Sequence, residues 1–286
     1  MKLRNNTADE FLTSISAHDA VFHYTRKSTA LERILFDDCF KFSSFANAND
    51  PYEYKDKMIG GGGWGWEKVR DEADKTCEVL DKLLKDVSFI SCCANTFEQD
   101  SLKIHGFLRS RMWSQYGESH KGVCLVLSKG KLINLIREKY KDEMYLFYQA
   151  DVDYKEYLNA NSGYDSIEIN SDSFDGKTPN SIAIDHIEKY QRELLFSKQL
   201  DYIDEHEHRI VALRKEHGMG SIVPPEFKVS KCLIGVILGD RFPEVYMPAI
   251  DKLSKDIGFE YRQLHWESGE YFLLCPRTRG CLDQPA

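Results

Sequence analysis

Short apolar runs of strand length recur along the chain, and they restrict the fold more than any other feature of the sequence. Residues dense in apolar side chains and bounded by polar or turn-forming ones lie at 21–25, 87–94, 122–127 and 233–238. Such runs are typical of buried strands. Apolar residues at helical spacing separate several of them, at 69–84, 132–136 and 181–199. This irregular alternation of strands and helices predicts an α+β fold.

Composition indicates a globular chain with room for a sizeable core. The 286 residues are 42% hydrophobic and 29% charged, which suits one domain spanning 1–286. A glycine-rich segment near 55–66 and a segment near 159–180 rich in Ser, Asn, Asp and Gly break the pattern. We expect both to be excursions on the surface of that domain. The glycine run lacks the Lys-Ser/Thr ending of a phosphate-binding loop, so its expected role is a linker.

Net charge, hydropathy and cysteine content indicate which partners and which cellular compartment to expect for the chain. The net charge of -8 argues against a surface that holds nucleic acid chiefly by neutralising phosphates. No stretch approaches the ~18 apolar residues that cross a bilayer, so we expect a soluble protein with no membrane partner. The eight cysteines have no C-x-x-C spacing and the N-terminus has no apolar export segment, which predicts a reduced, cytoplasmic protein. No metal is expected, because the histidines show no ligand spacing.

Acid, acid and base recur at every second residue where the chain enters the apolar run 210–213. Glu205, Glu207 and Arg209 would share one strand face. The two carboxylates would then lie about 6–7 Å apart, close enough to raise one pKa of the pair. Such a set can orient a sugar hydroxyl and stabilise a cationic transition state, but it is also a common charge pattern on exposed strands. Arg209 could bind a phosphate or neutralise the acids, and we favour the counter-ion.

Three other segments place polar or aromatic side chains beside apolar strands. They are His23, Tyr24 and Thr25; Asn49 and Asp50; and Trp113, Ser114 and Tyr116. Each has a structural alternative, because a histidine in an apolar strand is most often bonded to backbone in the core. Asn and Asp commonly cap turns, and tryptophan packs between layers more often than it stacks on a cofactor. A nucleophilic Cys92 or Cys93 is a weaker possibility, since buried thiols are normally inert.

Four sequence strings occur together in an order that resembles a bacterial family. They are HYT, NDPYE, MWSQYGESHKGVCL and EHEHR, within roughly residues 20–275. The chain is similar to the family catalogued as domain of unknown function 2971, which in turn resembles a remote branch of the ADP-ribosyltransferase fold. That resemblance implies a split β-sheet core, meaning two packed antiparallel or mixed sheets, with flanking helices. It also implies NAD as substrate and transfer of ADP-ribose to an unknown protein or nucleic-acid acceptor, in a toxin or phage-defence role.

The resemblance also implies a role for each candidate residue. His23 would hold the adenosine-side ribose, and Tyr24 or Tyr116 would flank the nicotinamide. Glu207 would be catalytic by gripping the nicotinamide ribose, and Glu205 would position or deprotonate the acceptor. The expected NAD-binding set is completed by Thr25, Asn49, Asp50, Trp113, Ser114 and Arg209. The family's aromatic residue before the acidic strand is matched only loosely, by Tyr202.

Two rival functions stay open at this point. In an NAD glycohydrolase, water would replace the acceptor and Glu205 would activate it. In a non-catalytic module, the same cleft would sense a nucleotide or bind a protein, and Glu207 would be structural.

Overall fold

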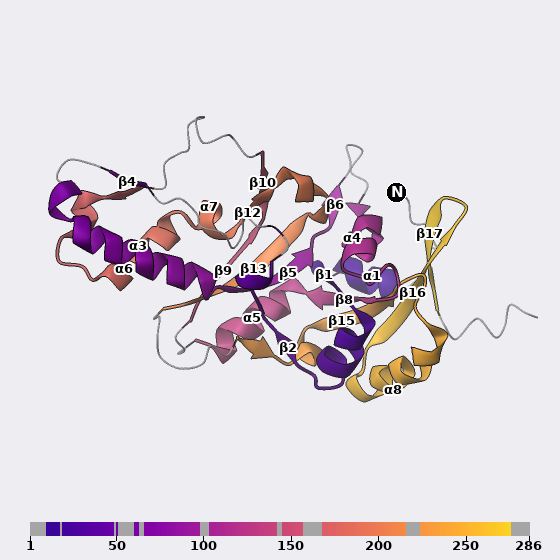
Figure 1. The fold of residues 1–286 in the computed structure, drawn as a ribbon. Helices are drawn as coiled ribbons and strands as arrows, with labels where there is room; N and C mark the ends of the chain where they lie inside the picture. Colours follow the sequence, from indigo (N-terminus) through magenta and orange to yellow (C-terminus); the bar gives the residue numbers. More distant parts are fainter. Residues whose placement is uncertain are drawn as a thin grey trace, which may run out of the picture.

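A mixed sheet of nine strands forms the centre of the described part of the chain in this computed structural model (Figure 1). The structure describes residues 10–17, 19–48, 50, 60–62, 66–97, 103–141, 145–156, 168–215 and 224–275. The strand order is β17-β16-β15-β8-β1-β5-β13-β9, and β3 pairs with β5 beside this path. The pairings are antiparallel except for the parallel pair β15 and β16. The strands are β1 (Ala20–Thr25), β3 (Ser43–Ser44), β5 (Ser88–Cys93), β8 (Val123–Ser128), β9 (Tyr145–Asp151), β13 (Glu207–Arg214), β15 (Leu233–Leu238), β16 (Glu260–Glu267) and β17 (Glu270–Leu274).

The α+β prediction is confirmed, but the expected pair of packed sheets is wrong. The described strands of the core join one sheet, because β8 pairs with both β1 and β15 and so connects the two halves. β1 pairs with β8 over its whole length but meets β5 in register only at Phe22 and Cys93. The sheet therefore opens between β1 and β5 instead of dividing into two stacked layers.

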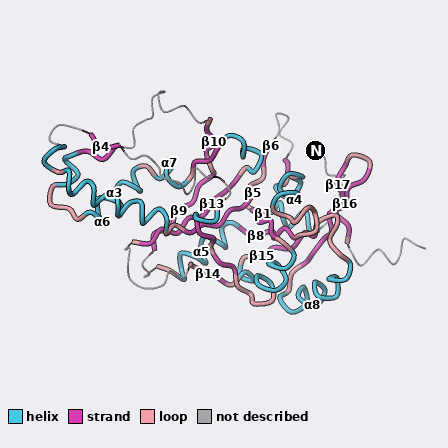
Figure 2. Tube along the Cα trace, viewed as in Figure 1, coloured by secondary structure: helices cyan, strands magenta, loops and turns pink. Residues whose placement is uncertain are grey.

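Helices cover both faces of the sheet, and Figure 2 shows α5 and α8 on the side away from α4. In the central strand β8, Val123, Leu125 and Leu127 face one core layer, while Cys124 and Val126 face the other. A strand buried on both faces needs apolar residues throughout, which explains its continuous apolar run. The helices are α1 (Glu10–Ala17), α3 (Arg70–Lys85), α4 (Ser110–Gln115), α5 (Lys129–Lys139), α6 (Pro179–Lys189), α7 (Gln191–Leu195) and α8 (Met247–Ile257), with a π-helix, η1 (Thr29–Leu35), after β1.

The two predicted surface excursions pair with each other. β4 (Gly60–Gly62), in the glycine run, runs parallel to β11 (Glu168–Asn170). Ile169 is buried in a core cluster shared with α3 and α6, and these elements form one end of the molecule (Figure 1). The described part of the glycine run is therefore a strand, and the linker prediction is wrong there. Residues 55–59 and 63–65 of the first excursion and 159–167 of the second lie outside the described residues.

Three further strand pairs lie beside the central sheet. They are the parallel pair β10 (Asp153–Lys155) and β12 (Ser197–Gln199), and the antiparallel pairs β2 (Phe40–Lys41) with β14 (Glu226–Phe227) and β6 (Thr96–Phe97) with β7 (Lys103–Ile104). The pair β2 and β14 matters for the site, because it places Phe40 beside β1.

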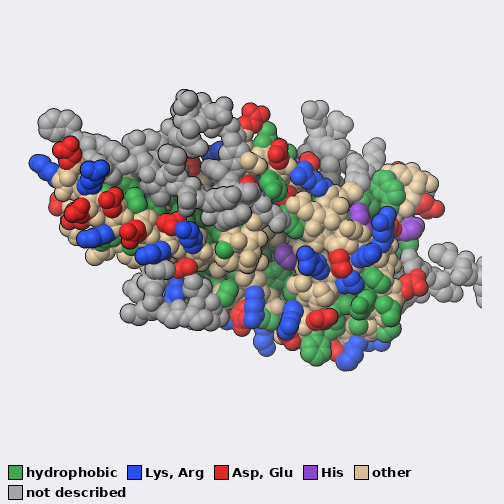
Figure 3. Space-filling model, in the orientation of Figure 1, with side chains coloured by type: hydrophobic (Ala, Val, Ile, Leu, Met, Phe, Trp, Pro, Cys, Tyr) green, Lys and Arg blue, Asp and Glu red, His purple; other side chains and the backbone are tan. Residues whose placement is uncertain are grey.

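The visible face of the molecule carries charges of both signs. Acidic and basic side chains are interspersed along α3 in Figure 3, and neither sign forms a continuous patch there. Among the described helices, none combines the length and apolar character needed to span a membrane.

Candidate functional site

A cleft opens where β1 and β5 diverge. Two adjoining cavities lie there, with volumes of about 200 and 930 Å³. Both are lined by His23, Tyr24, Phe40, Ser43 and Tyr116. We call this pair of cavities the β1/β5 cleft. Its larger part has the size typical of small-molecule and cofactor sites.

His23 stands where the two cavities adjoin, and the backbone holds its ring. Nδ1 lies 2.9 Å from the carbonyl oxygen of Ser91, and the ring packs edge-on against Phe40. Because a carbonyl only accepts, Nδ1 carries the proton and Nε2 is an acceptor. Burial lowers the pKa of His23 more than the bond to Ser91 raises it, so the ring is neutral at pH 7. His23 is thus bonded to backbone, as its structural alternative predicted, and also lines the cleft.

Tyr24 and Trp113 form a packed aromatic wall. The Tyr24 hydroxyl donates to the carbonyl of Gly106 at 2.7 Å, and its ring meets Trp113 edge-on at 4.9 Å. Trp113 is fully buried and donates its indole N–H to the carbonyl of Phe107 at 2.8 Å. It packs between layers and is absent from the lining of both cavities. Thr25 lines the larger cavity, as expected for a nucleotide contact, whereas Trp113 does not.

Glu205 lies directly behind the wall of the cleft. Tyr116 donates its hydroxyl to Oε1 and Lys198 donates to Oε2, each at 2.7 Å. Both donors line the smaller cavity, whereas Glu205 itself is 2% exposed. The ring of Tyr202, the loose match to the family's aromatic residue, lies 4.8 Å from the Lys198 ammonium. Glu205 is therefore one side chain away from the cleft.

Glu207 forms a buried two-point ion pair with Arg209. Nε lies 2.7 Å from Oε1 and Nη2 lies 2.8 Å from Oε2. Lys198 approaches Oε2 to 3.3 Å. Burial alone would raise the pKa of Glu207, but the charges of Arg209 and Lys198 and hydrogen bonds from Arg209 and Ser91 outweigh it and lower the pKa. The rise expected in one pKa of the acid pair therefore does not occur at Glu207.

Arg209 is the counter-ion of Glu207, the role the sequence favoured. Its side chain is 1% exposed, and it also donates to the carbonyl of Leu195 at 2.9 Å. The guanidinium lies over the rings of Phe45 and Phe89. It is absent from the lining of the cleft, so a phosphate in the cleft cannot contact it as the chain stands.

The acidic pattern is only partly a strand pattern. Glu207 and Arg209 alternate along β13, but Glu205 ends the 3-10 helix η6 (Leu200–Glu205). His206 between them has a φ of 42°, a left-handed conformation uncommon outside glycine. The prediction that all three share one strand face is therefore wrong for Glu205. The two carboxylates converge nevertheless, because Lys198 contacts both.

Glu207 does not face His23 across the cleft. His23 packs on Phe40, in the core layer that contains Cys92. Glu207 is in register with Cys93, which belongs to the opposite layer. Residues directly opposite in register point to the same face, and successive residues point to opposite faces. The expected pairing of His23 with Glu207 around one ribose is thus wrong in this geometry.

Besides Trp113 and Arg209, two described members of the expected NAD-binding set, Asp50 and Ser114, do not line the cleft. Asp50 is fully buried, and its carboxylate accepts the backbone N–H of Gln199 at 2.9 Å, where it anchors the end of β12. Ser114 is exposed and absent from the lining of both cavities. Asn49 lies outside the described residues.

Sequence reasoning missed the cations of the site. Arg26 and Arg33 line the larger cavity, and neither has an ion-pair partner among the described residues. Lys41 also lines it and pairs with Glu226 at 3.4 Å. In the sequence, one feature could have indicated a cation at the site: Arg26 directly follows the HYT string. No sequence pattern pointed to Lys198, because no local spacing links it to Glu205 and Glu207.

Cysteine and metal chemistry find no support in the part of the chain that is described. Cys93 is buried, and its thiol donates to the carbonyl of Glu205 at 2.7 Å. Burial raises the pKa of both Cys92 and Cys93, so both are thiols at neutral pH. No group of three or more described His, Cys, Asp or Glu side chains is arranged to hold a metal ion.

Comparisons with known proteins bear on the segment that carries the acids. The family described as "Protein of unknown function (DUF2971)" matches residues 112–210. No curated protein matches the chain, and no solved structure matches it. The matched segment contains Tyr116, Lys198, Glu205 and Glu207, so it includes one part of the wall of the cleft and the acids behind it. The predicted resemblance to domain of unknown function 2971 is confirmed over residues 112–210, where this chain matches the DUF2971 family, and the similarity to the ADP-ribosyltransferase fold stays a prediction.

Proposed function

We propose that this protein binds NAD in the β1/β5 cleft and transfers ADP-ribose to a macromolecular acceptor. The observation that carries the proposal is a cleft of nucleotide size whose wall residues Tyr116 and Lys198 both donate to the buried acid Glu205. A carboxylate beside the sugar stabilises the oxocarbenium-like transition state through which a glycosidic bond is cleaved.

The side chains of the cleft fit the parts of a dinucleotide. Phe40 and Tyr116 offer aromatic surface to a planar base. Arg26 and Arg33 offer unpaired positive charge for a diphosphate, the role that Arg209 cannot fill from its buried ion pair. The neutral ring of His23 keeps Nε2 free to accept a hydrogen bond from a ribose hydroxyl.

We assign the catalytic charge to Glu205 in preference to Glu207. Breaking the bond between ribose and nicotinamide produces an oxocarbenium-like transition state, which a fixed carboxylate stabilises. Glu207 already has Arg209 bonded to both of its oxygens, whereas Glu205 is separated from the cleft only by Tyr116 and Lys198. Displacement of the Tyr116 side chain by the entering nucleotide would bring Glu205 to the reacting ribose.

Incubation with labelled NAD and cell lysate tests the proposal, scoring free nicotinamide and the labelled macromolecule together. We expect the wild type and the exposed-lysine control Lys255→Met to give both products. Glu205→Gln should lower nicotinamide release by about 100-fold or more, because it removes the charge and keeps the shape. Release unchanged in Glu205→Gln rejects the assignment. Glu207→Gln is less informative, since it leaves Arg209 buried without its counter-ion and threatens the fold.

A non-catalytic, nucleotide-sensing module is a second candidate, and one observation favours it. Both carboxylates are already neutralised, Glu205 by Lys198 and Glu207 by Arg209 and Lys198. Calorimetry separates this candidate from the enzyme, because a sensor would bind NAD without releasing nicotinamide. Nicotinamide release without a labelled macromolecule would instead identify the glycohydrolase.

A further inference from the structure

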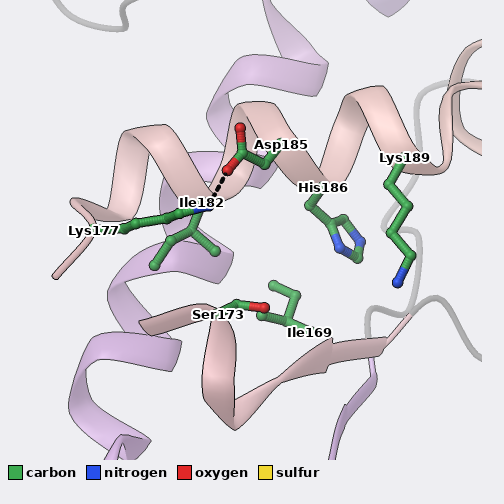
Figure 4. Close-up of a pocket in the computed structure, with 7 residues that line it drawn as sticks. All are labelled: Ile169, Ser173, Lys177, Ile182, Asp185, His186 and Lys189. Atoms are coloured by element: carbon green, nitrogen blue, oxygen red, sulfur yellow. Dashed lines mark hydrogen bonds and ion pairs between the residues drawn. The ribbon is translucent and has the colours of Figure 1, made fainter. Parts of the chain in front are cut away.

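A separate cavity lies between α6 and the segment that begins with β11, at the end of the molecule formed by α3, α6 and β4 (Figures 1 and 4). Its volume is about 100 Å³. That is several times the ~10–15 Å³ that one water molecule needs. Its polar lining consists of Ser173, Lys177, Asp185, His186 and Lys189. We call it the His186 cavity.

His186 has an unpaired polar atom aimed into this cavity. The residue is 5% exposed, and its Nε2 has no hydrogen-bond partner among the described residues. In Figure 4 its ring points from α6 toward the segment that carries Ile169 and Ser173. Burial, and secondarily the charge of Lys189, lowers the pKa of His186 to about 4, so the ring is neutral at pH 7. A buried polar atom without a partner costs free energy that a suitable ligand would recover.

The other polar groups of the cavity determine the charge of that ligand. Lys177 is already paired with Asp185 at 2.6 Å (dashed line in Figure 4). Lys189 has its ammonium 4.8 Å from the ring centre of Tyr190 and no carboxylate partner in the described part of the chain. A cation would meet two ammonium groups here, and one of them has no carboxylate to offset it. The uncommitted groups, including the Ser173 hydroxyl, can all donate hydrogen bonds.

We infer that the His186 cavity binds a small oxyanion, a phosphate or sulfate group, through the imidazole N–H of His186, the hydroxyl of Ser173 and the charge of Lys189. Charge-assisted hydrogen bonds from such donors are the strong ones. The volume suits one tetrahedral anion, and the cavity shares no lining residue with the β1/β5 cleft, so this site is distinct from the cleft and does not depend on the function proposed for it.

Titration of the full chain with inorganic phosphate tests the inference, at constant ionic strength maintained with sodium chloride. Calorimetry should show saturable binding, and the thermal midpoint should rise with phosphate, because a ligand that binds only the folded state stabilises it. Sulfate should compete. A parallel titration with O-phosphoserine distinguishes a free ion from a phosphate group carried by a partner, and saturable binding of either supports the site.

Two variants and one control make the test specific. Lys189→Met and His186→Gln should each weaken phosphate binding by about tenfold or more, whereas Lys255→Met, which removes an exposed lysine on α8, should leave it unchanged. Absence of saturable binding in the wild type overturns the inference, and so does binding of equal strength in Lys189→Met. Lys189 is exposed, so that variant decides the matter even if His186→Gln does not fold.

Discussion

Replacing Lys198 by Met tests whether the buried ionic cluster behind the cleft is as enclosed as the structure describes. The ammonium lies 2.7 Å from Glu205 Oε2 and 3.3 Å from Glu207 Oε2, and all three side chains are at most 5% exposed. At an effective dielectric constant of about 20, these attractions amount to about 6 and 5 kcal/mol before desolvation. Desolvation cancels several kcal/mol for each buried ion.

The expected net effect follows from what the substitution leaves behind. Glu207 keeps Arg209, but Glu205 remains buried, and among the described side chains only the Tyr116 hydroxyl still donates to its carboxylate. A buried charge that loses its partner costs about 3–5 kcal/mol, so Lys198→Met should lower the free energy of unfolding by that amount.

Urea unfolding followed by circular dichroism measures the change in midpoint and slope. Adding Glu205→Gln to Lys198→Met removes the carboxylate charge that the first substitution leaves without its ion-pair partner, and should restore about 1–3 kcal/mol relative to Lys198→Met alone. The matched control is Lys252→Met, which breaks an exposed ion pair with Asp256 and should cost at most about 1 kcal/mol. If Lys198→Met costs no more than this control, or the double variant shows no recovery, the cluster is not buried as described.

Two further outcomes follow from individual residues. A Cβ at Gly239 would lie 2.1 Å from the carbonyl oxygen of His120, so Gly239→Ala should lower the free energy of unfolding by about 3 kcal/mol. A Cβ at Gly130 in α5 would meet no atom within 4 Å, so Gly130→Ala should raise the free energy of unfolding by about 0.5–1 kcal/mol. Thermal unfolding of both variants measures the two changes. Shifts of the same sign in the two melting temperatures would contradict the packing. Burial first, and the charge of Lys189 second, lower the pKa of His186 to about 4, below the value of about 6.5 in the unfolded chain. The neutral His186 therefore contributes to stability above pH 6.5, and this contribution is lost as the pH falls toward 4. When the pH is lowered from 7 to 4.5, the free energy of unfolding should therefore fall by about 2 kcal/mol less in His186→Gln than in the wild type, after allowance for solvent at the cavity mouth. Equal losses in the two proteins would show that His186 is not buried in its neutral form.

Local patterns in the sequence determined the α+β class and most of the central strands. β8 is one example, because a strand buried on both faces must be apolar throughout. The same holds for the contact of Glu207 with Arg209, since residues two apart on a strand share a face. The roles of Trp113 and Cys93 also follow their ordinary preference for the core.

Only the tertiary structure decided where the sheet opens and which side chains meet behind that opening. Tyr116 and Glu205 are 89 positions apart in sequence, and no periodicity connects them or brings Lys198 between the two acids. The pKa of Glu207 is lowered first by Arg209, which the spacing places beside it, and further by Lys198, whose approach the spacing could not indicate. Periodicity reports which face a residue takes on its own strand or helix, whereas the site is built from contacts between elements that are distant along the chain.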